Sequence, residues 1–379
     1  SDLAASVASA SGGAGFGVYY LNSAGVINSG TGTIYIEGYS QTASGSSYGS
    51  GIVLSLNNSN TTTITSANTT SNAIKLLGIA TGTSGEVWGI ETEASPLNIY
   101  ATGVGGGISV LTSQKNTGSN YDAVYRSAVE ILANGGDIKL LGGQTLSGSA
   151  GIANGIWQIE AAWSLGSKTG SSYVASSTSN ITINYDKYYF SGINPTIKTT
   201  GTFTWDASGA STTGFGQSVN TGWFAITGIS GLSIGSLANT QNIKIGSNLT
   251  VNGNVTLLAM GGTSADIYMD DSTGSLTVTG ANSTTLIKAS EHVYMYSASG
   301  GITVNGTGSN TLTIMAGKDI MINQAINGAS GKPLTVNLYS DVDNTGGGAI
   351  LLASTASIAT YGGNITLRGG TGDTTLGCA

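Results

Sequence analysis

Residues that could carry out acid/base or nucleophilic chemistry are few in this chain and far apart. Its 379 residues include two arginines, Arg126 and Arg368, one histidine, His292, and one cysteine, Cys378. General acid/base catalysis needs clustered carboxylates with a cation or a strong base beside them. One histidine does not make a nucleophilic triad without partners, and one histidine with one cysteine leaves a His/Cys zinc site short of ligands.

Two of the three carboxylate pairs have ordinary structural interpretations. Asp270-Asp271 stands before a Ser-Thr-Gly turn, where aspartate is a common turn former. Glu91 and Glu93 alternate along one expected strand, so their side chains share a face. We interpret that face as a solvated edge, with a weak cation site as the alternative.

The third pair, Asp341 and Asp343, opens an alternating run of oxygen ligands before a glycine, as a calcium loop does. The bidentate glutamate of such a loop is missing, because Leu352 stands at its position. We interpret the run as a polar loop between two strands, and His292 as a surface or ladder residue. The sequence therefore predicts no catalytic residue, no cofactor-binding residue and no metal ligand, and we expect no enzyme.

The composition argues against several classes of protein. Lys and Arg number 12 and Asp and Glu 19, so charged residues make up 8% of the chain, against about 25% in ordinary globular proteins. The net charge of −7 carries no basic surplus, which argues against nucleic acid or an anionic membrane as a partner. The hydrophobic share of 39% and the mean hydropathy of +0.13 argue against disorder.

A short alternating strand that follows a glycine is the recurring unit of the chain. Apolar and polar residues alternate within it, which is the period of a strand with one buried face. The glycine suits the tight corner before the strand. The clearest examples are Gly30–Ile36, Gly106–Val110, Gly135–Leu140, Gly274–Val278, Gly300–Val304 and Gly362–Leu367.

The spacing of these strands predicts an all-β fold, a right-handed parallel β-helix with loop excursions. Three strands make a repeat of roughly 20 to 30 residues, which is in the range of solenoids. Coils stacked about 4.8 Å apart place like side chains in ladders, which suit aliphatic residues, Thr, Ser and Asn but not charges. An antiparallel sandwich stays open, because Asn-Gly turns begin at Asn252, Asn305 and Asn327. In the C-terminal part the expected strand starts are Ile302, Leu312, Ile320, Leu334, Ile350, Ile358 and Ile365.

Two stretches depart from this pattern. Residues 120–134 have small and apolar residues at helical spacing, but we favour two strands, Ala123–Arg126 and Ala128–Leu132. Residues 156–222 are rich in aromatic residues, and we expect irregular coils or an excursion from the β-helix there. We expect residues 1–379 to form one continuous β-helix segment of a larger exoprotein.

Three runs in the second half of the chain carry a family resemblance. They resemble the β-helical repeats of filamentous haemagglutinin-like adhesins, the exoproteins of two-partner secretion. A further stretch, Tyr188–Gly209 followed by Ile226–Ser236, resembles a recurrent unit of large bacterial surface repeat proteins. The three runs are LTIMAGKDIMINQAI (Leu312–Ile326), LTVNLYSDVDNTGGGAI (Leu334–Ile350) and GGNITLRGG (Gly362–Gly370).

The resemblance implies export across the outer membrane to the surface of a Gram-negative-type cell. It implies a non-enzymatic, secreted or surface-bound rod that mediates attachment or builds a fibre, for example in a biofilm. The partners it implies are glycans or proteins on host or neighbouring cells, an outer-membrane secretion partner and further copies of the chain. From the charge and the residues themselves we expect no nucleic-acid partner and no cofactor.

The alternative function is a carbohydrate-active β-helical enzyme, either a polysaccharide lyase or a glycoside hydrolase. A groove lined by three or more acidic residues beside an Arg or a Lys would favour it. An ice-binding solenoid is a third hypothesis, although the Thr-rich strands are too scattered for a flat threonine array. Four tyrosines could stack on sugars, but we expect core or ladder packing instead. They are Tyr19, Tyr20, Tyr188 and Tyr189.

Overall fold

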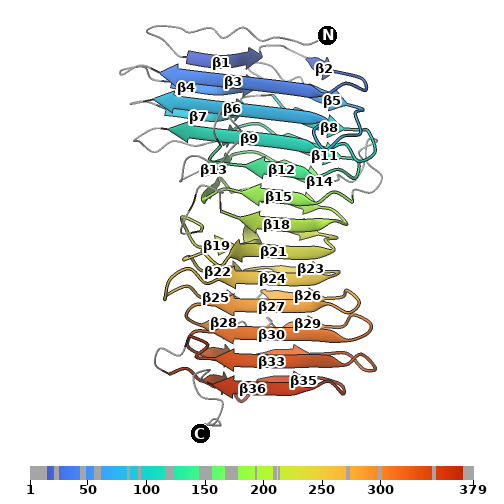
Figure 1. Ribbon diagram of the computed structural model, residues 1–379, viewed down its shortest axis with the longest axis vertical. Coiled ribbons are helices and arrows are strands. Elements are labelled where there is room, and N and C mark those ends of the chain that lie inside the picture. The colour runs from blue at the N-terminus through green and yellow to red at the C-terminus, as the bar shows by residue number, and fades with distance from the viewer. Residues whose placement is uncertain are drawn as a thin grey trace. The chain divides into compact units, whose positions relative to one another are not determined.

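The computed structural model shows regular structure that is almost all β-strand (Figure 1). The strand pairs of the described residues run parallel, apart from an isolated antiparallel bridge between Ala329 and Lys332. The described part of the chain contains one 3-10 turn, η1 (Thr221–Trp223), and no helix there is long and apolar enough to cross a membrane. The structure describes residues 15–20, 25–42, 48–54, 61–82, 86–92, 95–115, 123–144, 156–166, 178–192, 194–207, 211, 214–269, 274–296, 301–343 and 347–369.

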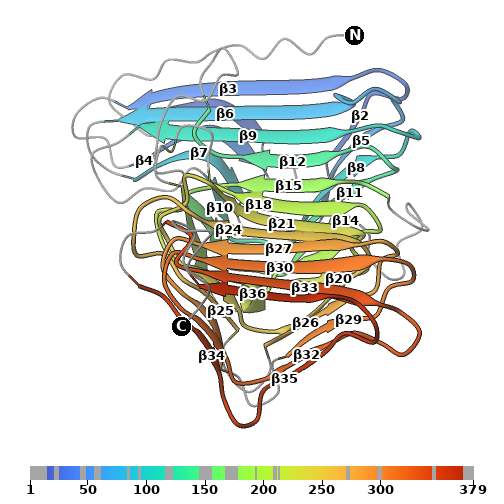
Figure 2. The same ribbon diagram turned by 60° about the horizontal axis from the view of Figure 1, so that its bottom comes forward.

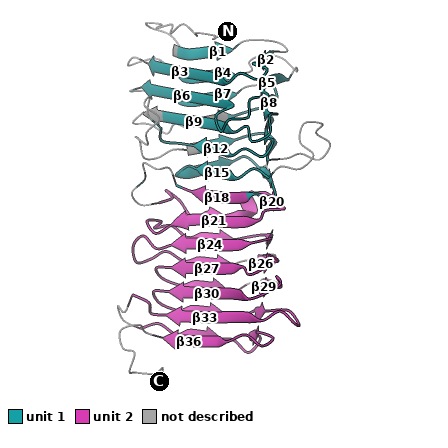
Figure 3. Cartoon of the chain, turned by 45° about the vertical axis from the view of Figure 1, so that its right-hand side comes forward, with its two compact units in different colours: residues 1–201, 207–212 teal, residues 202–206, 213–379 magenta. Residues whose placement is uncertain are grey.

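The chain divides into two compact units, which are coloured separately in Figure 3. Unit 1 holds residues 1–201 and 207–212, and unit 2 holds residues 202–206 and 213–379. Within each unit the chain passes through three parallel sheets in turn and then repeats the circuit one coil further on. Each unit is therefore a parallel β-helix, the fold that the strand spacing predicts.

Unit 1 winds through sheets that we name A, B and C. Aliphatic residues at the same place in successive coils pair with one another, as Ile74 does with Ile108 and Ile108 with Ile138, and all three are fully buried. Sheet A holds β1 (Gly15–Tyr20), β4 (Tyr48–Leu54), β7 (Glu86–Thr92), β10 (Ala123–Tyr125), β13 (Ile156–Ile159) and β16 (Lys187–Phe190). Sheet B holds β2 (Val26–Asn28), β5 (Thr62–Ser66), β8 (Leu97–Ala101), β11 (Val129–Ala133), β14 (Trp163–Gly166) and β17 (Thr196–Lys198). Sheet C holds β3 (Ile34–Thr42), β6 (Ile74–Gly82), β9 (Ile108–Lys115), β12 (Ile138–Leu141) and β15 (Ile181–Asn184).

Unit 2 winds through sheets D, E and F, and Figure 2 shows their last strands, β36, β34 and β35, on three sides of one coil. A ladder of buried aliphatic residues, including Leu257, Ile287 and Ile314, fills its interior. Sheet D holds β18 (Thr202–Asp206), β21 (Gly231–Ser236), β24 (Asn254–Ala259), β27 (Thr284–Ala289), β30 (Asn310–Ala316), β33 (Leu334–Ser340) and β36 (Ile365–Gly369). Sheet E holds β19 (Val219–Asn220), β22 (Ile243–Ile245), β25 (Ile267–Met269), β28 (Val293–Met295), β31 (Ile320–Ile322) and β34 (Ile350–Leu352). Sheet F holds β23 (Asn248–Val251), β26 (Ser275–Val278), β29 (Ile302–Val304), β32 (Ala325–Asn327) and β35 (Ser357–Ala359). One further strand of unit 2, β20 (Ala225–Thr227), precedes β21 and lies outside sheets D, E and F.

Glycines bring two sheets of unit 1 into backbone contact along one line, which we name the glycine seam. Its members are Gly17, Gly51 and Gly89 of sheet A and Gly38 and Gly78 of sheet C. A Cβ on Gly38 would lie 1.9 Å from the carbonyl oxygen of Gly51, and a Cβ on Gly78 would lie 2.1 Å from that of Gly89. No side chain fits at these distances, so the two backbones touch across the interior.

The Asn-Gly pairs of unit 2 form corners between parallel strands. Asn252-Gly253 joins β23 to β24, and Gly280 and Gly306 occupy the same corner of the next coils. A Cβ on Gly280 would lie 2.4 Å from the Cα of Gly253, and a Cβ on Gly306 would lie 1.8 Å from the carbonyl oxygen of Gly280. The glycines are therefore required by contact between coils, and the antiparallel sandwich alternative is wrong.

The strand predictions agree closely with the described strands. The seven start residues expected in the C-terminal part all lie within β29, β30, β31 and β33 to β36. Residues 123–125 and 129–133 form β10 and β11, so the helix alternative for residues 120–134 is wrong. Between residues 156 and 222 the described residues form β13 to β19. The excursion expected there and the single continuous segment stay predictions.

Candidate functional site

The residues that precede five of the six strands of sheet E occupy the same place in successive coils. These five residues are Asn242, Asp266, His292, Asp319 and Ala349, and they precede β22, β25, β28, β31 and β34. The strands that follow are three residues long, and their first and third residues are apolar and buried in β22, β25, β28 and β31. Because these strands pair in parallel register, the residues before them form a column on the outside of the coil.

Side-chain acceptors in this column bond to the next coil, and we name the arrangement the acceptor ladder. Asn242 Oδ1 accepts from the amide of Asp266 at 2.8 Å, and Asp266 Oδ1 accepts from the amide of His292 at 3.0 Å. His292 Nδ1 then accepts from the amide of Asp319 at 3.2 Å, and Asp319 Oδ1 from the amide of Ala349 at 2.8 Å. Each side chain thus satisfies a backbone donor at a coil corner.

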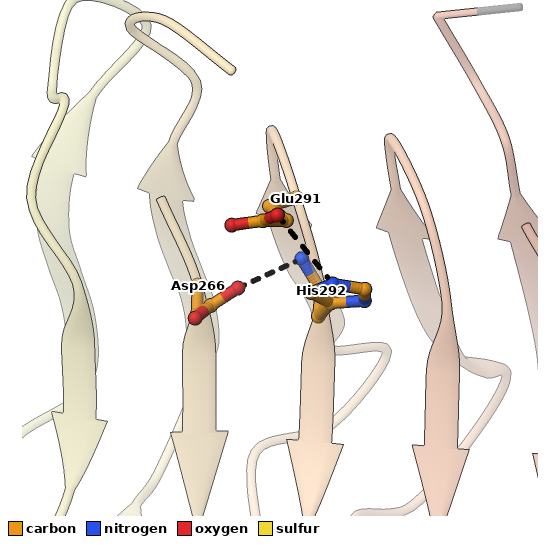
Figure 4. Close-up of side chains that lie close together, drawn as sticks. All are labelled: Asp266, Glu291 and His292. Carbon is orange, nitrogen blue, oxygen red and sulfur yellow. Dashed lines mark hydrogen bonds and ion pairs between the residues drawn. The ribbon is translucent and has the colours of Figure 1, made fainter. Parts of the chain in front are cut away.

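Charged groups lie close to His292, and Figure 4 shows two of them, Asp266 and Glu291. The Nε2 of His292 lies 3.6 Å from Glu291 Oε1, and its Nδ1 lies 3.4 Å from Asp319 Oδ2. Lys318 Nζ lies 2.7 Å from the same oxygen of Glu291. Because Nδ1 accepts a hydrogen bond, the neutral ring carries its proton on Nε2, on the side of Glu291.

Burial and hydrogen bonding act on the ionisable groups of this cluster. Burial raises the pKa of Asp266 above its usual value, although the hydrogen bond from the His292 amide opposes that shift. The hydrogen bond to Glu291 raises the pKa of the exposed Lys318 ammonium.

Aromatic side chains continue the same outer face of sheet E. Tyr268 pairs with Tyr294, and Tyr294 pairs with Met321 in the next coil. The rings of Tyr294 and Tyr296 stack at 4.9 Å, and the ring of His292 lies 5.1 Å from that of Tyr294. Burial raises the pKa of Tyr294 to about 12, so its hydroxyl stays protonated at neutral pH.

The cluster offers ligands that suit a cation. Asp266, Glu291 and His292 each place one ligand atom so that the three atoms lie within 4.8 Å of one another, and no other such group of His, Cys, Asp or Glu occurs among the described residues. Imidazole with carboxylate oxygens suits zinc and related divalent ions. Three carboxylates beside a lysine are also the set that acid/base chemistry on a polysaccharide would need.

The structure separates most of the residues that the sequence singled out. Glu91 is 3% exposed and lies 2.7 Å from Arg126 Nη1, so the interpretation of Glu91 as a solvated edge is wrong. Asp341 and Asp343 lie between β33 and β34, as the loop interpretation predicts. His292 has the ladder position expected of it. Glu93, Asp270, Asp271 and Cys378 lie outside the described residues.

The four tyrosines differ in exposure. Tyr188 is buried against Trp157, which agrees with core packing. Tyr20 is partly buried, while Tyr19 and Tyr189 are exposed.

Asp266, Glu291 and Asp319 were missed as a cluster because they are one coil apart in sequence. The ladder bonds join residues 24, 26, 27 and 30 positions apart, so no fixed period aligns them. A signal was present in the repeated strings DIYM, HVYM and DIMI, which begin at Asp266, His292 and Asp319. Aligning these strings places the three residues in one column.

The acceptor ladder predicts different effects for two substitutions of Asp266. Asp266→Ala leaves the amide of His292 without its acceptor, and we expect the free energy of unfolding to fall by about 1–2 kcal/mol. Asp266→Asn keeps an oxygen at the same place, as Asn242 does one coil earlier, and should cost less than about 0.5 kcal/mol. Urea unfolding of both variants measures the difference, and equal losses would show that the bond contributes nothing.

Comparison of the chain with known protein families, with curated proteins and with solved structures finds no match.

Proposed function

We propose that this protein is a non-enzymatic structural or adhesive protein, secreted or held at the cell surface, that mediates attachment or builds a surface fibre. The observation that carries the proposal is the regular parallel stacking of coils in each unit, with aliphatic ladders inside and few charges. Within each unit, backbone hydrogen bonds join the described strands of successive coils. Such a scaffold resists extension, which suits a load-bearing attachment.

Exposed aromatic residues supply contact points for a partner. Tyr19 is 46% exposed, Tyr189 52% and Tyr296 49%. Aromatic rings contribute contact area at interfaces with little loss of side-chain entropy. We propose that the partners are glycans or proteins of host or neighbouring cells, and that further copies of the chain associate into fibres.

The proposed location rests on the resemblance to two-partner secretion exoproteins. We propose that the chain lies outside the cell, after export through an outer-membrane secretion partner. Antibody raised against the chain should label intact producing cells or their medium. Labelling only after lysis would contradict this location.

The attachment role predicts saturable binding to cells. Fluorescently labelled chain should bind a target cell surface with a plateau, or electron microscopy should show fibres of the unlabelled chain. Heat-denatured chain is the control, because it has the same sequence without the fold. Absence of both binding and fibres in chain shown by circular dichroism to be folded would overturn the proposal.

The acidic cluster favours a second candidate, a carbohydrate-active enzyme. Asp266, Glu291 and Asp319 lie around His292, and Lys318 bonds to Glu291. Against it, the side chains of Asp266, His292 and Asp319 are engaged as backbone acceptors in the ladder. Incubation with acidic and neutral polysaccharides, followed by reducing-end analysis, tests this candidate. Product that disappears in Glu291→Gln would establish it in place of the structural role.

A further inference from the structure

We propose that Asp266, Glu291 and His292 bind one divalent transition-metal ion, of which Zn²⁺ is the best match, on the outer face of sheet E. This inference does not depend on the proposed function. It rests on the donor set, on the positions of the ligand atoms and on the carboxylate behind the imidazole.

The spacing of two of the three ligand atoms is close to that of a tetrahedral zinc site. Two ligands about 2.1 Å from a tetrahedral Zn²⁺ lie about 3.4 Å apart. His292 Nε2 and Glu291 Oε1 are 3.6 Å apart, so these two atoms need almost no movement. The Asp266 carboxylate completes the group within 4.8 Å, and it lies in the neighbouring coil, so the ion would join two coils. Three protein ligands leave the fourth position to water.

Asp319 provides the outer partner that metal-binding histidines usually have. A ligating imidazole donates its other N–H to a carboxylate or a carbonyl, which fixes the ring and raises its basicity. Asp319 Oδ2 lies 3.4 Å from His292 Nδ1, while the Asp319 amide lies 3.2 Å from it. Binding of the ion at Nε2 would move the ring proton to Nδ1. The ring would then exchange its bond from the Asp319 amide for a bond to the Asp319 carboxylate.

In the metal-free state Lys318 bonds to one of the three proposed ligands, Glu291. Its ammonium bonds to Glu291 Oε1, the atom we assign as a ligand. The Lys318 side chain is 46% exposed, so it can turn into solvent when a divalent cation takes its place. Lysine and metal therefore compete for one oxygen, and removal of the lysine should strengthen metal binding.

The acceptor ladder allows ligands to be removed without loss of the fold. An asparagine at position 266 or 292 keeps a side-chain acceptor for the next amide, as Asn242 does in its own coil. Asp266→Asn removes the charged ligand, and His292→Asn removes the imidazole. Asp137→Asn, a remote exposed carboxylate of unit 1, is the matched control.

Isothermal titration calorimetry tests the site: the untagged full chain, treated with chelator to remove metal, is titrated with ZnCl₂. We expect one ion per chain. Affinity should fall by at least ~100-fold in His292→Asn and by about 10-fold or more in Asp266→Asn, and it should rise in Lys318→Met. Asp137→Asn should bind as the original chain does. Absence of binding, or binding unchanged by His292→Asn or Asp266→Asn, would overturn the proposal.

The single histidine of the chain gives a second readout that does not depend on affinity. In protein labelled with ¹⁵N-histidine, the imidazole should show its proton on Nε2 without metal and on Nδ1 with zinc bound. Asp319→Asn keeps a side-chain oxygen that can accept from the amide of Ala349. It replaces the carboxylate that would accept the Nδ1 proton of His292 with a weaker, neutral acceptor, so the affinity for zinc should fall by about 10-fold. An imidazole spectrum that zinc leaves unchanged would contradict ligation by His292.

Discussion

Gly78→Ala should lower the free energy of unfolding of unit 1 by at least ~3 kcal/mol. The added methyl carbon would lie 2.1 Å from the carbonyl oxygen of Gly89 and 2.6 Å from Cγ1 of Ile90. The neighbour at 2.1 Å is backbone in a paired strand, so it cannot turn aside as a side-chain end can. Sheets A and C would have to separate by more than ~1 Å to reach ordinary contact distance, which is severe overpacking.

A matched substitution separates this steric effect from a conformational one. Gly30 has a φ of +59° and nothing within 4 Å of its Cβ position, so Gly30→Ala carries only the strain of a left-handed residue. We expect a loss of about 1 kcal/mol for Gly30→Ala. Urea unfolding, monitored by tryptophan fluorescence, gives the free energy of unfolding of each variant. If Gly78→Ala lowered the free energy of unfolding no more than Gly30→Ala does, sheets A and C would be able to separate at the glycine seam without loss of stability.

Trp157→Ala should cost about 3–5 kcal/mol, the range for removal of a buried large aromatic side chain. Trp157 is fully buried in unit 1, where its ring lies 4.9 Å from the ring of Trp163 and stacks on Tyr185 at 5.7 Å. Tyr188 and Phe190 lie edge-on to it at 6.1 and 6.0 Å. The alanine would leave a cavity among rings that already contact one another, so the surroundings can close it only in part.

Trp157→Phe and Trp223→Ala are the controls for this prediction. The first keeps an aromatic ring and should cost less than half as much as the alanine variant. Trp223 is only partly buried, so its loss should be small by comparison. Thermal unfolding of the three variants gives the order of stability. If Trp157→Ala were no worse than Trp223→Ala, the aromatic group around Trp157 would not be a stabilising core.

The coils of unit 2 could be predicted from sequence because they obey simple local rules. Strands such as Ile302–Val304 and Ile320–Ile322 carry two buried aliphatic residues around one outward residue, and small or polar residues surround them. Ala325–Asn327 escaped prediction, because Ile326 is its one large aliphatic residue. The alternating pattern identifies a strand where both inward positions are large and apolar.

The burial of Glu91 could not be predicted in the same way. Alternation shows that Glu91 faces opposite to Ile90, but both residues of β7 are buried. Arg126, one coil later, bonds to Glu91 and lies over the ring of Trp88 at 4.9 Å. The outer face of a strand is covered by residues of neighbouring coils, about 35 positions away in the sequence. The alternating pattern of the strand itself does not show which residues these are.

The candidate site needed register as well as pattern. Each of its residues is ordinary alone, and the column appears only when coils of unequal length are aligned. The glycine seam could not be predicted for a similar reason. The sequence does not show whether a glycine is needed for a turn before a strand or for close contact with another strand. Only contact between Gly78 and Gly89 distinguishes a steric requirement from a turn.

The pairing of each coil with its immediate predecessor has a consequence for how each unit acquires its structure. Strand partners such as Ile314 and Leu338 are separated by one circuit of the chain, so contact order stays low for a protein built of parallel strands. A newly formed strand needs only the exposed edge of the preceding coil to pair with. Folding can therefore proceed coil by coil from one terminus as the chain is synthesised. A fault such as a one-residue deletion would arrest that advance at the damaged turn while leaving earlier turns intact.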